Sequence, residues 1–136
     1  MKTKVIFIIL AVISLHLSGQ QTEHLTMSET KIGMVKITIM YPNEQGKTFD
    51  MDYYANKHMP MVANLFGTPL KGYGIDKGIA GRTPDELLPY LAIGYFYFDS
   101  IEAYNNAFGP NAEKILGDIP NYTNIKPVVL ISEVVH

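Results

Sequence analysis

The chain has 136 residues, no cysteine and a formal net charge of −2. This length favours one domain, and the missing cysteine excludes disulfides, thiolate catalysis and thiolate metal sites. No cluster of lysine or arginine is present, which argues against nucleic acid or an anionic membrane as a partner and favours a small, largely apolar one.

The first 20 residues have the pattern of a secretory signal peptide. Lys2 and Lys4 precede an apolar run over residues 5–17, and small residues follow at a predicted cleavage site near residues 18–20. The run is too short to span a bilayer comfortably, so no stable membrane span is expected after cleavage. The pattern predicts a periplasmic or secreted protein.

The alternative is that translation starts at Met27 or Met34, which would leave a cytoplasmic protein. Residues 21–33 are polar and lack a sustained period, which predicts a linker. The predicted domain therefore covers residues 34–136.

The first predicted elements are a strand and a helix. Residues 35–41 alternate apolar and polar side chains, as a half-buried strand does. Asp50 is the expected N-cap of the helix, and Gly67 with Pro69 supplies its stop signal. Spacings of three and four residues place one set of side chains on a single inward stripe: Met51, Tyr54, Ala55, His58, Val62 and Leu65.

Three more strands are predicted further along the chain. Residues 70–81 are rich in glycine but alternate, which indicates a strand that is bent or closely approached by another backbone. Residues 90–98 carry apolar or aromatic side chains on both faces, as a central, doubly covered strand does. Residues 125–135 form the last strand, and Pro127 predicts that it is an edge strand or bulged.

A second helical region is predicted between the last two strands. Asp99 and Glu102 resemble a capping box at its start, and Gly109 is expected to close the first helix. Pro110 is suited to open a further helical piece that ends at Gly117.

The predicted order, β-α-β-β-α-β, is that of the ferredoxin-like fold. This α+β arrangement places two helices on one face of a four-stranded antiparallel sheet. The opposite face would carry aromatic and aliphatic side chains without cover from a chain of this length. A homodimer formed sheet to sheet is therefore expected.

His58 is the strongest candidate for chemistry, because beyond the predicted linker the sequence holds only His58 and His136. A buried neutral imidazole can exchange a proton near neutral pH. The alternative is a core histidine bonded to a carbonyl. Pro60 cannot donate to the carbonyl of Asn56, so the helix should kink or restart there, or Pro60 simply begins a second helical piece.

Four tyrosines are candidates for the lining of a pocket. Tyr54 shares the helical stripe with His58 and is the preferred second catalytic residue. Tyr41, Tyr53 and Tyr73, together with Pro60, are candidate ligand-binding residues, although core packing is the alternative role for each tyrosine. The sequence has no dinucleotide or Walker motif and no transition-metal ligand set, so no cofactor and no metal site are predicted.

Several segments also resemble the EthD family, named after a component of ethyl tert-butyl ether degradation clusters. The run "DMDYYANKHMP", the triplet "FGP" and the run "DIPNYTN" carry the similarity, which extends over residues 34–134. The resemblance implies a dimeric α+β barrel with a ligand pocket between each sheet and its own helices. It also implies a pocket role for His58 and a link to oxidoreductase pathways.

Two functions follow as expectations. The first is a cofactor-independent catalyst of monooxygenase or cyclase/isomerase type, acting on a small hydrophobic compound. In it His58 moves a proton and Tyr54 stabilises an oxyanion. The second is a non-catalytic ligand-binding or accessory protein of a degradation pathway. A haem-binding role, with His58 as axial ligand, is the least supported reading.

Overall fold

The computed structural model describes residues 30–136, so the predicted signal peptide and most of the predicted linker lie outside the described residues. The elements are, in order, β1 (Val35–Pro42), α1 (Met51–Tyr53), η1 (Tyr54–His58), α2 (Met59–Phe66), β2 (Leu70–Lys77), β3 (Tyr90–Phe98), α3 (Ile101–Phe108), η2 (Gly109–Asn111), α4 (Ala112–Asp118), η3 (Ile119–Asn121) and β4 (Val128–Glu133).

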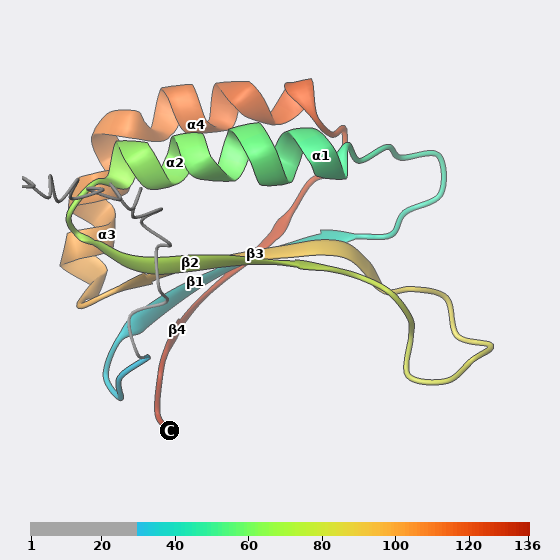
Figure 1. Cartoon of the computed structure of the whole chain (residues 1–136), viewed down its shortest axis with the longest axis horizontal. Helices are drawn as coiled ribbons and strands as arrows, with labels where there is room; N and C mark the ends of the chain where they lie inside the picture. The colour runs from blue at the N-terminus through green and yellow to red at the C-terminus, as the bar shows by residue number, and fades with distance from the viewer. Residues whose placement is uncertain (1–29) are drawn as a thin grey trace, which may run out of the picture.

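The four strands form one antiparallel sheet in the order β2-β3-β1-β4. Both helical stretches lie on the same side of it, with α4 running beside α2 (Figure 1). The predicted ferredoxin-like arrangement is confirmed. β3 is central, as expected, and β4 is an edge strand that begins directly after Pro127.

The first helix is continuous but irregular. Asp50 caps it as predicted, since its Oδ1 accepts a hydrogen bond of 2.9 Å from the backbone N–H of Tyr53. The turn η1 is a π-helix, in which the N–H of Met59 bonds to the carbonyl of Tyr54. Pro60 follows at the start of α2, where its missing N–H costs least. The predicted break beside Pro60 is thus a widened turn within one helix.

The second helical stretch differs from the prediction at its first cap and by one residue at the end of α4. Ser100, and not Asp99, is the cap, because Ser100 Oγ accepts from the N–H of Ala103 at 3.1 Å. Asp99 instead pairs with Lys71. Gly109 is the C-cap of α3, as predicted, although its φ is negative and a short 3₁₀ turn, η2, follows directly. Gly117 lies inside α4, which ends one residue later, at Asp118.

The core lies between the sheet and the helices. Its largest fully buried side chains are Ile37, Tyr41, Tyr54, Met59, Val62 and Phe98. No helix of residues 30–136 covers the opposite face of the sheet (Figure 1). Four successive residues of β4, Val128 to Ile131, are each about half exposed. Within residues 30–136, no helix is both long and apolar enough to cross a membrane.

Candidate functional site

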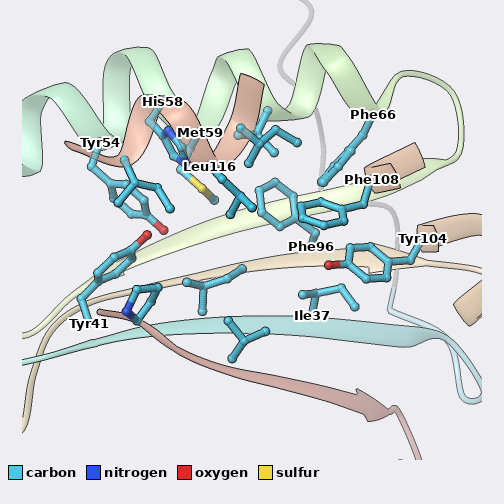
Figure 2. Close-up of a pocket in the computed structure, with 16 residues that line it drawn as sticks. Ile37, Tyr41, Tyr54, His58, Met59, Phe66, Phe96, Tyr104, Phe108 and Leu116 are labelled. Carbon is cyan, nitrogen blue, oxygen red and sulfur yellow. The ribbon is translucent and has the colours of Figure 1, made fainter. Parts of the chain in front are cut away.

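A cavity of about 120 Å³ lies between the sheet and the helices. Figure 2 shows its lining, with His58, Tyr54 and Tyr41 at one end and Phe66, Phe108 and Tyr104 at the other. None of the 16 lining side chains belongs to a lysine, arginine, aspartate or glutamate. The cavity is therefore apolar, with polar atoms supplied by one histidine and three tyrosines.

His58 is buried at one end of this cavity, with 5% of its surface exposed. Its Nδ1 lies 2.8 Å from Oδ2 of Asp118, the last residue of α4. An ionised carboxylate only accepts hydrogen bonds, so His58 Nδ1 carries the proton and Nε2 has the lone pair. Asp118 in this way fixes both the orientation and the tautomer of the ring.

Asp118 is itself held by further hydrogen bonds. Its Oδ1 accepts from the hydroxyl of Tyr53 at 2.9 Å and from the side-chain amide of Asn121 at 2.8 Å. Burial alone would raise the pKa of Asp118, but the hydrogen bonds from His58, Asn121 and Tyr53 outweigh it and lower that pKa. Asp118 is therefore a carboxylate at neutral pH.

The pKa of His58 is shifted in the direction that suits a base. Burial lowers this pKa below its ordinary 6.5, and the nearby carboxylate of Asp118 offsets only part of that effect. His58 is therefore neutral at pH 7 and able to accept a proton at Nε2.

Tyrosines surround the imidazole. The ring of Tyr54 stacks on that of His58, with centroids 5.8 Å apart, and the ring of Tyr122 lies 4.6 Å away. The hydroxyl of Tyr122 shares a 2.6 Å hydrogen bond with that of Tyr41. Burial raises the pKa of Tyr41, Tyr54 and Tyr122, so all three are neutral hydroxyls that can donate a hydrogen bond.

A glycine in the central strand makes room for Tyr54. A Cβ atom at Gly94 of β3 would overlap the hydroxyl oxygen of Tyr54 and would lie 3.1 Å from Cε of Met59. The hydroxyl of Tyr54 therefore reaches across to the sheet, where it points toward that of Tyr41 (Figure 2).

The structure brings three of the six sequence candidates together. His58, Tyr54 and Tyr41 line the same end of the cavity, whereas Tyr53, Tyr73 and Pro60 are absent from its lining. Tyr53 instead lies outside the cavity and donates a hydrogen bond to Asp118. Tyr73 stacks on Phe96 with centroids 6.1 Å apart, and Pro60 is exposed on the helix.

Sequence reasoning missed Asp118, Tyr122 and Tyr104. Asp118 and Tyr122 both lie in the run "DIPNYTN", so the family resemblance contained the signal, but nothing in that run indicated contact with His58. Tyr104 lines the far end of the cavity, where burial raises its pKa.

Two observations bear on metals and cofactors. Within residues 30–136, no three histidine, aspartate or glutamate side chains gather as metal ligands would. A cavity of about 120 Å³ is comparable to one that holds a single benzene ring. It does not fit a porphyrin, so the haem reading finds no support in the geometry.

The topology and the cavity define a ferredoxin-like α+β protein with a buried pocket beneath its helices. The family model described as the EthD domain matches residues 43–125. The chain therefore belongs to the EthD family.

Three solved structures are similar to the chain. An EthD-like protein from Ralstonia eutropha JMP134 is 42% identical, with 78% of this chain and 96% of that one covered and a TM-score of 0.73. An Arabidopsis thaliana protein (17% identity, 75% and 96% covered, TM-score 0.56) shares the fold. An ethyl tert-butyl ether degradation (EthD) family protein from Bacillus halodurans C-125 is 20% identical (74% and 97% covered, TM-score 0.49). No curated protein matches the chain.

Proposed function

We propose that the protein binds a small hydrophobic compound in the cavity and that His58 acts there as a general base. The observation that carries the proposal is the buried His58–Asp118 pair at the end of an otherwise apolar cavity. A histidine that only filled the core would not need a carboxylate to hold its tautomer. The pair resembles the base and orienting group of acid–base catalysts in its geometry.

The tyrosines supply the second half of the proposed chemistry. When Nε2 takes a proton from an acidic C–H or O–H group, negative charge develops on an oxygen of the bound compound. The neutral hydroxyl of Tyr54 is placed beside His58 and can donate a hydrogen bond to that oxygen. The apolar surroundings strengthen such a hydrogen bond.

Hydrogen–deuterium exchange of cyclohexanone, a neutral carbon acid with a single ring, tests the base. In D₂O the wild-type protein should accelerate exchange at the carbons beside the carbonyl, as followed by proton NMR. A positioned base contributes about 10²–10⁴-fold, so His58→Gln should lose at least that order of rate. The proposal is contradicted if exchange in the presence of the wild-type protein is no faster than in buffer alone. It is also contradicted if His58→Gln accelerates exchange as much as the wild type does.

Asp118→Asn separates positioning from structural support. Because exchange needs neutral His58, the wild-type rate should be flat above pH 6.5 and fall in acid. Asp118 raises the pKa of His58, so its replacement by asparagine should move this fall to lower pH while reducing the plateau. A lower plateau with an unmoved midpoint would mean that Asp118 serves the fold alone.

A second candidate function is binding without chemistry, which the wholly apolar body of the cavity favours. In that case cyclohexanone would raise the melting temperature of the wild-type protein and of His58→Gln equally, and neither protein would accelerate exchange. The two functions therefore give opposite results in the same pair of proteins.

We also propose a homodimer in which the uncovered sheet faces pack together. This face carries Met40, Ile93, Tyr95, Tyr97 and Leu130, by the register of the strands. Lys36 lies on the same face, with its Nζ over the rings of Tyr95 and Tyr97. Exposed aromatic and aliphatic side chains gathered in this way are normally covered by a partner.

A further inference from the structure

We infer that the ligand is a neutral, single-ring compound with a weakly acidic hydroxyl group, and that it enters the cavity between Leu116 and Val129. This inference rests on the proposed function and narrows it to a class of compound. Four properties of the cavity carry it: its size, its lack of charge, the position of its polar atoms and the place where it reaches the surface.

The size and lining fit one ring. The cavity has a volume of about 120 Å³, and an apolar cavity of about 150 Å³ is known to bind benzene. Phe66, Phe96 and Phe108 line the end away from His58. Aromatic side chains pack favourably edge to face against a further ring.

The electrostatics exclude an anion. Among residues 30–136, no lysine or arginine lines the cavity, and the histidine there is neutral. The carboxylate of Asp118 lies 2.8 Å behind the imidazole, so an anion at Nε2 would meet a negative charge. A carboxylate would also lose its hydration without gaining a cationic partner, which is costly.

The polar atoms lie together at one end. Because Asp118 occupies Nδ1 of His58, Nε2 is an acceptor for a hydroxyl on the ligand. The hydroxyls of Tyr54 and Tyr41 point into the same end and can donate to the ligand oxygen (Figure 2). One hydroxyl at one end of an apolar body therefore matches the site better than a wholly apolar ligand.

Two lining residues identify the entrance. Leu116 on α4 and Val129 on β4 both line the cavity, yet each has 54% of its surface exposed. A side chain that faces the cavity and the solvent at once must stand at an opening. The opening therefore lies between α4 and the edge strand, with an apolar rim suited to a hydrophobic compound.

Phenol, toluene and benzoate test the class, because they share a ring and differ in one group. Isothermal titration calorimetry should show binding of phenol and toluene to the wild-type protein, and benzoate at least 100-fold weaker than phenol. His58→Phe keeps an aromatic ring but removes the acceptor. The variant should bind phenol about fivefold more weakly, which corresponds to the loss of one neutral hydrogen bond, and its affinity for toluene should be unchanged.

Leu116→Trp tests the entrance. It should slow phenol association at least tenfold in stopped-flow measurements, whereas Leu87→Trp should not. Leu87 is a matched control because it is 85% exposed and does not line the cavity.

Benzoate that binds as tightly as phenol, or no binding of phenol at millimolar concentration, overturns the ligand class. Equal association rates in the two tryptophan variants overturn the entrance. None of these results contradicts the proposal that His58 is a base, because exchange of cyclohexanone and its dependence on His58 are measured separately. If the protein binds phenol but does not accelerate exchange, His58 is not a general base, and the inferred class of ligand still holds.

Discussion

The two ring nitrogens of His58 have different surroundings, and this difference defines the site. Nδ1 donates to Asp118 in a hydrogen bond of 2.8 Å on one side. Nε2 is left for the cavity, where neutral tyrosine hydroxyls accompany it. A ring held in one tautomer loses little orientational freedom when a ligand arrives, which is the advantage of a positioned base.

The shifted pKa of His58 makes stability depend on pH. Below its ordinary pKa of 6.5, His58 takes up a proton in the unfolded chain but not in the folded one. The free energy of unfolding should therefore fall as pH drops from 7.5 to 5, by up to about 1.4 kcal/mol per pH unit until the lowered pKa is reached.

Urea denaturation at several pH values measures this effect, with His58→Gln as the comparison. Glutamine has no proton to gain, so the slope of the variant over the same range should be flatter. Its side-chain amide can still donate to Asp118, and in the wild type the lowered pKa of Asp118 places the contribution of that carboxylate below pH 4. Identical slopes in the two proteins would show that His58 is not buried neutral.

At this scale the sequence reveals only part of the site. Helical and strand periods determine which face a side chain takes, so His58, Tyr54 and Tyr41 could be placed toward the interior. Asp118 lies 60 residues from His58 along the chain, and a carboxylate near a helix end has no periodic signal. Its role depends on how α4 docks beside η1, which a single sequence does not encode in a readable way.

The helices show which element boundaries follow from local chemistry. Asp50 caps the first helix because an aspartate before an amphipathic stripe has few competing roles. At the start of the second helix, Asp99 and Ser100 are adjacent and both are able to cap, so the local sequence does not choose between them. In the structure Ser100 is the cap, and Asp99 pairs with Lys71. Gly117 was expected to end α4, but the helix ends one residue later, at Asp118, because Gly117 keeps a helical backbone instead of a positive φ.

The close contact between β3 and the first helix gives a prediction about Gly94. An alanine there would push its Cβ into the hydroxyl of Tyr54 and against Met59. Gly94→Ala should destabilise the protein by about 1–3 kcal/mol, the usual cost of overpacking a core. Chemical denaturation measures this loss.

Tyr54→Phe provides the test of cause. It removes the atom that the new Cβ would meet first, so Gly94→Ala should cost less in that background than in the wild type. Gly109→Ala is the control, since a Cβ at Gly109 has no heavy atom within 4 Å. An equal cost of Gly94→Ala in both backgrounds would mean that Tyr54 does not reach the strand.

At the scale of the whole molecule, the described part of the chain leaves one face of the sheet uncovered, and β4 allows the proposed dimer to be tested with neighbouring residues. Leu130 pairs with Thr38 on the open face, whereas Ile131 pairs with Ile37 on the helix-covered face. The two are similarly exposed, at 53% and 47%. Leu130→Glu should give a monomer by light scattering at micromolar concentration, whereas Ile131→Glu should remain a dimer. A monomeric wild-type protein contradicts the proposed packing.

The site is assembled from the two halves of the chain. The hydrogen bond between His58 and Asp118 joins residues 60 positions apart, and that between Tyr41 and Tyr122 joins residues 81 positions apart. Contacts of such long range require the loops between them to close, which slows folding. The lowered pKa of His58 requires these contacts, so it should appear only once the two halves have docked, which makes this imidazole a reporter of their docking.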